Sequence, residues 1–385
     1  MKKIFNLTIF SILVIFTLFS CHFMNVSVDV KALDSNISYY TIYADDSKTK
    51  VLFLKGDDVS AGDNYLSQDN KLYEIIEVDD KNKTAIAKFL KDEQLPEFDV
   101  KREYNQTANA QTQKKVGVYH THNDESYFTP DGVDSVYGKG GIHDVGKSFV
   151  DELTKLGISV VYREDLHLPH NSGAYTRSQV TASAILETGV DGIFDLHRDS
   201  TKRSEYLTTI DGQQMSSVRM VVGAASANFE ENKNFAYSIK SYADKIYPGL
   251  IKDIYIGKGN YNQQLTTRAM LFEMGCENIE KDLVLKTTSY LAKVVDVVLF
   301  GSNAASEESL RDVAVGGENG IVGLANSATD SSVNSNETLY VLLSVGAIIL
   351  LTLIIVLIFS KKARYKVGRF FSEMFAGVFG KRKTR

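Results

Sequence analysis

Short apolar segments alternate with longer amphipathic ones over residues 116–300, and this alternation restricts the fold more than any other feature. Short apolar runs are typical of buried strands, and apolar residues at intervals of three or four are typical of the helices that cover them. We expect strands at 116–119, 158–162, 190–196, 220–223, 251–256 and 269–274, and helices at 142–156, 175–187, 229–247 and 278–300. The pattern predicts an α/β domain over residues 115–300, with a mainly parallel sheet and helices on both faces.

Residues 37–100 instead alternate polar and apolar positions in short runs that turn-rich segments separate. Strands are expected at 39–43, 51–54, 72–78 and 84–90, which predicts a small antiparallel β module ahead of the α/β domain. This module shows no catalytic constellation, so we interpret it as accessory. Residues 101–114 are polar without periodicity and residues 301–337 are rich in Ser, Asn, Ala and Gly, as linkers are.

Residues 4–24 and 338–360 are almost continuously apolar and contain no Asp, Glu, Lys or Arg. This predicts two flanking membrane segments, one within an N-terminal signal or anchor at 1–32 and one at 338–360. Whether the first is retained, cleaved after Ala32 or lipidated at Cys21 stays open. The tail at 361–385 carries nine bases and one acid, as an amphipathic helix on the inner leaflet or a disordered topology signal would.

The charge distribution indicates where the central region works. Basic residues follow the second apolar segment and precede the first, so the positive-inside rule places both termini in the cytoplasm if the first segment is retained. The catalytic domain would then lie outside the cytoplasmic membrane. Residues 25–337 hold 32 basic and 47 acidic residues, which argues against nucleic acid as a partner. The two cysteines, Cys21 and Cys276, form no disulfide framework.

Histidines and one glutamate fall where the predicted strands end. His120 and His122 follow the first strand, on one side of the chain if it stays extended, and Glu125 comes three residues later. His197 ends the strand at 190–196, and Glu273 lies near the end of the strand at 269–274. His143 stands at a helix entry. The carboxyl ends of parallel strands meet at one edge of a sheet, so these groups are candidates for one site.

Each candidate also has an ordinary structural interpretation. His143 is compatible with a helix cap, His197 with a salt-bridged network beside Asp195 and Arg198, and His167 and His170 with a solvent-exposed loop. Cys276 is a candidate nucleophile, although a core thiol is the better interpretation.

Zinc suits this set of side chains. It binds imidazole nitrogen and carboxylate oxygen, and a catalytic site leaves one position for water. Glu273 would then serve in proton transfer. The spacings do not form a compact ligand motif such as His-Glu-x-x-His, and the chain has no Gly-x-Ser-x-Gly motif and no phosphate-binding loop.

Five motifs in order resemble the stage II sporulation protein P family. They are Tyr119-His-Thr-His-Asn-Asp-Glu-Ser-Tyr127, Phe194-Asp-Leu-His-Arg-Asp-Ser200, Tyr247-Pro-Gly249, Tyr261-Asn-Gln-Gln264 and Leu271-Phe-Glu-Met-Gly275. The resemblance covers residues 115–300 and implies a peptidoglycan hydrolase of sporulation, acting in septal thinning and engulfment, similar in fold to zinc-dependent N-acetylmuramoyl-L-alanine amidases.

The resemblance also implies a role for each matching residue. The metal ligands are His122 (or His120), His143 and His197, and the catalytic acid/base is Glu273. Amidases of this fold carry Glu where His143 stands, so that ligand departs from the pattern, and Glu125 is an alternative. Arg198, Asn262 and Gln263 look like substrate-contacting groups.

The implied reaction is hydrolysis of the amide between N-acetylmuramic acid and L-alanine, with an endopeptidase activity on peptide cross-links beside it. The implied partners are peptidoglycan, the cytoplasmic membrane, a second peptidoglycan-degrading sporulation protein and a membrane complex. The competing hypothesis is a non-catalytic, membrane-tethered scaffold that binds cell wall and docks a partner hydrolase.

Overall fold

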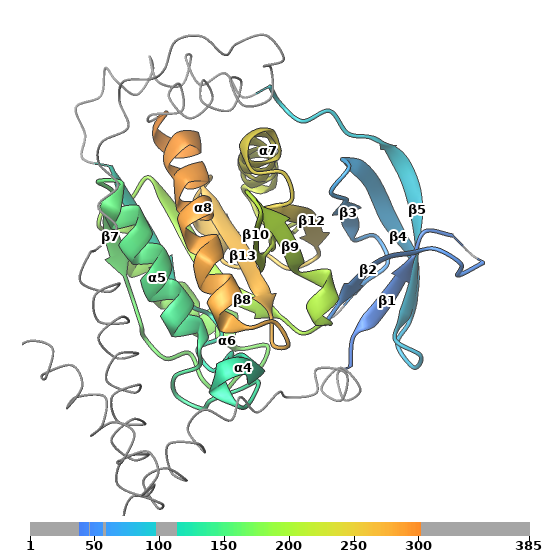
Figure 1. The fold of residues 1–385 in the computed structure, drawn as a ribbon, viewed down its shortest axis with the longest axis horizontal. Coiled ribbons are helices and arrows are strands. Elements are labelled where there is room, and N and C mark those ends of the chain that lie inside the picture. The colour runs from blue at the N-terminus through green and yellow to red at the C-terminus, as the bar shows by residue number, and fades with distance from the viewer. Residues whose placement is uncertain (1–37, 46, 57–58, 98–113, 302–385) are drawn as a thin grey trace, which may run out of the picture. The chain divides into compact units, whose positions relative to one another are not determined.

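The computed structural model describes residues 38–45, 47–56, 59–97 and 114–301 (Figure 1). Within these residues, eleven strands form one mixed sheet in the order β2-β1-β5-β4-β3-β12-β11-β13-β8-β6-β7. The strands of this sheet are β1 (Tyr40–Tyr43), β2 (Val51–Lys55), β3 (Asn64–Leu66), β4 (Lys71–Asp79), β5 (Thr84–Asp92), β6 (Lys115–Tyr119), β7 (Ser159–Tyr162), β8 (Gly192–Asp199), β11 (Val218–Gly223), β12 (Ile251–Gly257) and β13 (Ala269–Cys276). β9 (Leu207–Ile210) and β10 (Gln213–Ser216) form a separate antiparallel pair.

Helices cover both faces of the part of the sheet that follows residue 114. The helices are α4 (Phe128–Asp131), α5 (Ile142–Lys155), α6 (Ala174–Leu186), α7 (Phe229–Ile246) and α8 (Lys281–Phe300), with 3-10 turns η2 (Arg203–Glu205) and η3 (Gln263–Leu265). α5 and α8 lie side by side, and α7 packs against α8 (Figure 1). The apolar side of α5, which includes Val145, Phe149 and Leu153, is fully buried, which is why this helix forms on the sheet.

The opposite face of the sheet is covered by two different structures. α6 covers β6 and β8 with a small cluster that includes Ala182 and Ile185. The module of β1 to β5 covers β11, β12 and β13, where Val221, Tyr255 and Leu271 are buried among its aromatic residues. The site described below lies on this face, between α6 and the module.

The predicted elements are confirmed for most of the described chain, with ends shifted by one to three residues. Among the described strands and α-helices, three features were not predicted: β3, the short helix α4 and the β9–β10 hairpin. The hairpin turns at Asp211 and Gly212, which both have positive φ, the conformation that two-residue hairpin turns require.

The predicted fold class needs two corrections concerning the sheet. The antiparallel module is not a separate sheet, because β3 pairs with β12 and joins it to the rest. The sheet is also more mixed than expected. β7, β6, β8 and β13 run parallel, but β13 pairs with β11 in the antiparallel sense, and within the module that was predicted to be antiparallel β1 pairs with β5 in the parallel sense. The strands predicted within residues 37–100 and within residues 115–300 are present, but the sequence pattern did not predict how the two groups of strands pair with each other.

The prediction of two membrane segments is corrected as well. No helix among the described residues combines the length and apolarity that a membrane crossing demands. The ranges on which that prediction rested, 1–32 and 338–360, lie outside the described residues, as do the linkers at 101–113 and 302–337 and the basic tail at 361–385. The predicted membrane location with cytoplasmic termini is therefore withdrawn.

Candidate metal and hydrolase site

One row of charged side chains crosses four neighbouring strands. Asp253 of β12 stands opposite Arg219 of β11, Arg219 opposite Glu273 of β13, and Glu273 opposite His197 of β8. Residues paired directly across a sheet point to the same face, so all four face α6 and the module. Their strand neighbours Leu196, Met220 and Phe272 point the other way, into the core under α5, α7 and α8.

Three side chains converge at the His197 end of this row. One ligand atom each from His122, Glu125 and His197 lies within 4.8 Å of the others. The Nδ1 atoms of His122 and His197 lie 3.0 and 3.2 Å from the same oxygen of Glu125, its Oε1. The other oxygen, Oε2, accepts a hydrogen bond of 2.7 Å from the backbone N–H of Arg198. We call these three residues the His-Glu-His group.

The electrostatics of the His-Glu-His group favour the ionised form of Glu125 between the two imidazole rings. Burial acts to raise the pKa of Glu125, but the rings of His197 and His122 outweigh it and hold this pKa well below its ordinary value. Burial acts to lower the pKa of His197, but Asp195 and Glu125 raise it well above its ordinary value. Burial lowers the pKa of His122. The donor set of two imidazoles and one carboxylate suits zinc.

Asp195 supports His197 from the same strand. Its Oδ1 lies 3.1 Å from Nε2 of His197, on the ring edge away from Glu125. The carboxylate itself is held by Thr121, whose backbone N–H donates at 2.8 Å and whose hydroxyl donates at 2.6 Å. A carboxylate behind a histidine is the usual arrangement around a metal-ligating imidazole, because it fixes the ring and its tautomer.

His120 and His143 do not join the His-Glu-His group. The chain leaves the extended conformation after Tyr119, so His120 does not share a side with His122: its Nδ1 lies 3.0 Å from the Leu196 carbonyl and its Nε2 2.9 Å from the Tyr162 hydroxyl. His143 lies on the buried side of α5, with its ring 4.7 Å from that of His120 and its Nδ1 3.3 Å from Glu164. The structure brings in Glu125, the alternative, where His143 was expected.

One of the two loop histidines, His167, differs from the expectation of solvent exposure, whereas His170 is exposed as expected. His167 is buried, with Nδ1 2.7 Å from the His120 carbonyl and Nε2 2.8 Å from Thr181, which makes it a structural residue. The exposed ring of His170 stacks on that of His122 with 3.8 Å between centroids. A hydrogen bond to Asp124 raises the pKa of His170.

The residues predicted to contact substrate make hydrogen bonds within the protein. The guanidinium of Arg198 donates to the carbonyls of Ser126 and Asp134, at 3.1 and 2.8 Å. Asn262 donates to Ser178 at 2.9 Å. Gln263 accepts from the Gly223 N–H and donates to the Val221 carbonyl, which ties η3 to β11. These side chains thus hold the loops around the site, which a motif comparison alone does not reveal.

Glu273 lies in the wall of a cavity of about 430 Å³ next to the His-Glu-His group. His122 and Tyr175 line it on the α6 side, and Lys55 and Gly56 line it on the module side. Glu273 is only 5% exposed. Cys276, three residues on, is fully buried, and burial raises its thiol pKa, so the interpretation as a core thiol is confirmed.

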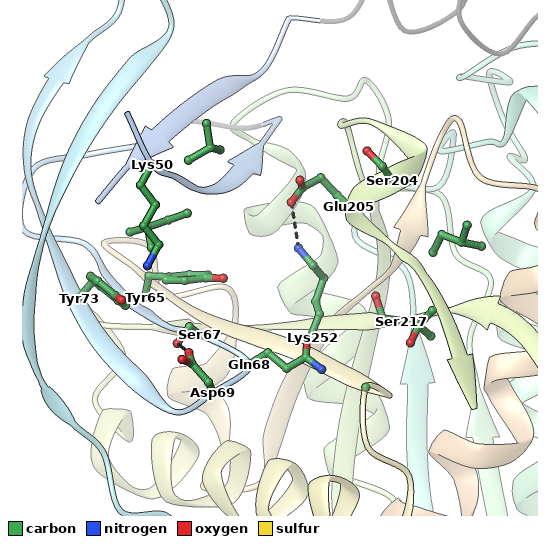
Figure 2. Close-up of a pocket in the computed structure, with 15 residues that line it drawn as sticks. Lys50, Tyr65, Ser67, Gln68, Asp69, Tyr73, Ser204, Glu205, Ser217 and Lys252 are labelled. Atoms are coloured by element: carbon green, nitrogen blue, oxygen red, sulfur yellow. Dashed lines mark hydrogen bonds and ion pairs between the residues drawn. The ribbon is translucent and has the colours of Figure 1, made fainter. Parts of the chain in front are cut away.

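A second cavity of about 740 Å³ is lined by other residues of the module and by Lys252 of β12 (Figure 2). Lys50, Tyr65 and Tyr73 line it from the module. Figure 2 shows Lys252 reaching Glu205, with 3.4 Å between the charged atoms. This larger cavity contains none of the predicted site residues.

Comparisons with known proteins give one matching family. The chain matches the sequence profile described as Stage II sporulation protein P over residues 39–296. It is 29% identical over 242 residues to Stage II sporulation protein P of Bacillus subtilis (strain 168), a match over 55% of this chain and 60% of that relative.

The solved structures that are similar at a lower level include two amidases. One is an N-acetylmuramoyl-L-alanine amidase from Clostridium difficile 630, with 14% sequence identity and a TM-score of 0.32 over 53% of this chain and 98% of that chain. The other is the CwlD amidase from Clostridioides difficile in complex with the GerS lipoprotein, with 12% sequence identity and a TM-score of 0.34 over 51% of this chain and 99% of that chain. Structural similarity at this sequence identity and TM-score does not identify the activity of this chain.

Proposed function

Because this chain belongs to the stage II sporulation protein P family, we propose that it is a zinc-dependent peptidoglycan hydrolase of sporulation. The reaction is hydrolysis of the amide between N-acetylmuramic acid and L-alanine, with cleavage of peptide cross-links as a second activity. One observation carries the proposal: His122, Glu125 and His197 converge beside a cavity whose wall contains Glu273. A second peptidoglycan-degrading sporulation protein is the proposed partner, on the family resemblance.

The His-Glu-His group would hold the metal. Its three donors are the types that zinc prefers, and Asp195 stands behind His197 as a supporting carboxylate. When bound there, zinc would polarise the scissile carbonyl and make water a stronger acid.

Glu273 is the proposed acid/base. It is one strand from His197 in the same cross-strand row, so its carboxylate faces the cavity that the His-Glu-His group borders. It would take the proton of the attacking water and give it to the leaving amine. Burial of this carboxylate keeps bulk water from competing for the proton.

Tyr175 and Tyr261 would orient the substrate. Both rings line the cavity, 5.5 Å apart between centroids and nearly perpendicular. Aromatic rings in a cavity wall give a sugar or peptide an apolar surface to pack against.

The test uses the purified full chain with peptidoglycan, followed by mass spectrometry of the products. New lactyl and L-alanine ends are expected, and a chelator should stop their release until zinc is restored. Glu273→Gln should lower the rate by about 10²- to 10⁴-fold, the usual contribution of a general acid/base, without changing zinc content. The matched control is Glu187→Gln, a remote glutamate at the end of α6. Product release that survives both the chelator and Glu273→Gln would defeat the proposal.

A further inference from the structure

The module places one basic residue in the cavity next to Glu273. Lys55 is the last residue of β2, and it lines the same cavity as Glu273 and His122. It is only 5% exposed, although lysine is among the residues least often buried. A strand from the part of the chain interpreted as accessory therefore completes the wall of the candidate site.

Both neighbours of Lys55 are anchored to the sheet. The carbonyl of Leu54 accepts two hydrogen bonds of 3.1 Å from the buried Arg219, and its N–H donates to Glu205. The N–H of Gly56 donates to Asp199 at 3.1 Å. A Cβ on Gly56 would come within 2.4 Å of the Ser200 backbone oxygen, so this close approach needs glycine. The backbone of Lys55 is thus fixed relative to β8 and β11.

The ammonium of Lys55 is held on an aromatic surface. Its Nζ lies 4.9 Å from the ring centroid of Tyr255, whose hydroxyl donates to Asp63. A cation over an aromatic face keeps its charge. The cavity therefore presents a positioned cation on one wall and the His-Glu-His group on the other.

We propose that Lys55 is a specificity residue that binds a carboxylate of the peptide stem of the substrate. This inference rests on the proposed function. A stem with its scissile amide at Glu273 would extend toward the module, and a cavity of about 430 Å³ would accommodate the L-alanyl residue of that amide together with the next residue. In a muramoyl peptide that next residue is a D-glutamyl unit, which carries either a free α-carboxylate or its amide. Lys55 would favour the free acid.

The test compares two soluble peptides that differ in this one group, N-acetylmuramoyl-L-alanyl-D-glutamate and N-acetylmuramoyl-L-alanyl-D-isoglutamine. Binding to the full-length Glu273→Gln variant is measured by calorimetry, so the result does not depend on turnover. The acid should bind tighter by on the order of ten- to a hundredfold, and high salt should reduce the difference. Adding Lys55→Met should remove the preference, whereas Lys55→Arg should keep part of it.

Lys50→Met is the matched control, because Lys50 precedes the same strand and points into the larger cavity, beside Tyr65 and Tyr73 (Figure 2). It should leave the preference intact. Equal binding of both peptides to the Glu273→Gln chain would overturn the proposal, and this result does not depend on the folding of any Lys55 variant. A preference that persists when Lys55→Met is added would overturn it as well. If the parent chain binds the acid selectively but cleaves neither peptide, the proposed function fails and the role of Lys55 stands. If the unmodified chain cleaves both peptides with equal kcat/KM, the proposed function stands and the role of Lys55 fails.

Discussion

Asp195 and His197 show how two residues of one strand build half of a site. A spacing of two in a strand puts both side chains on one face, and the carboxylate comes to 3.1 Å from Nε2 of His197. The sequence carries this signal, because Asp195 and His197 alternate with the apolar residues Phe194 and Leu196. What the spacing leaves open is which partner lies on the far side of the ring, and there the structure places Glu125 rather than His143.

Asp195→Asn should weaken zinc binding by roughly 10- to 100-fold, because the amide orients the His197 ring less firmly and no longer raises its basicity as a ligand. Competition with a chromogenic chelator measures this affinity. The control is Asp165→Asn, an exposed carboxylate paired with Arg163. Unchanged zinc affinity in Asp195→Asn would show that Asp195 does not support a metal ligand.

Glu277 gives the stability of the protein a pH dependence. Burial raises its pKa to about 7, although Arg198 and Ser200 act against it. A carboxyl whose folded pKa exceeds its unfolded pKa destabilises the fold as it ionises, so stability should fall as pH rises from about 4.5 to about 7. Glu277→Gln removes this loss, and above pH 7 it should be more stable than the parent by roughly 3 kcal/mol. Urea unfolding at pH 5 and pH 8 tests this; an equal difference between the two chains at both values would contradict it.

Among the elements, β11 joins the module to the site strands. Arg219 is fully buried and pairs with Asp253 at 2.7 Å, Asp199 at 2.6 Å and the Leu54 carbonyl. Burial acts to raise the pKa of Asp253, but Arg219 outweighs it and lowers this pKa to about 2. One side chain thus connects β12, β8 and β2.

Arg219→Met should cost about 3–5 kcal/mol in the free energy of unfolding, because it leaves two carboxylates buried without their cation. Chemical denaturation measures the loss. Arg163→Met is the control, since its ion pair with Asp165 is exposed and should contribute less than about 1 kcal/mol. A loss no larger than that of the control would mean that the two carboxylates find other partners or become protonated at little cost.

Helices and strands were predicted correctly where the apolar pattern was regular. They were missed where turn residues, and not an apolar pattern, determine the structure. The helices at α5, α7 and α8 follow from residues at intervals of three and four. The β9–β10 hairpin was missed even though Asp211-Gly212 is a strong turn signal between two short extended runs. β3 has only three residues, too few for a period to be recognised.

At the scale of the whole molecule, the fold depends on a pairing that no local pattern encodes. The strands of the module and of the α/β region were each predicted, but their union through β3 and β12 joins segments about 190 residues apart in the chain. The candidate site follows the same division. Glu273 and His197 could be placed at strand ends, whereas Lys55 could not be assigned to the site without knowing how the module packs.

Deletion of residues 38–97 should therefore abolish the soluble fold of the remaining chain. It would expose Val221, Tyr255 and Leu271 on one face and leave β12 as an unpaired edge, which favours aggregation. Sedimentation and binding of an apolar dye measure the outcome. A truncated chain that stays monomeric and melts cooperatively would show that the module is dispensable for folding.

The alternation along β13 has a consequence for how this protein can vary. Glu273 faces the cavity, while Phe272 and Met274 on either side face the helices. Because side chains alternate between the two faces of a strand, the register of β13 decides which of them reach the cavity and which pack in the core. Inserting or deleting one residue between Ala269 and Glu273 would exchange them, burying the acid among hydrocarbon and turning a benzyl ring toward the substrate. Changes in chain length are therefore tolerable in the connections before and after this strand but not within it.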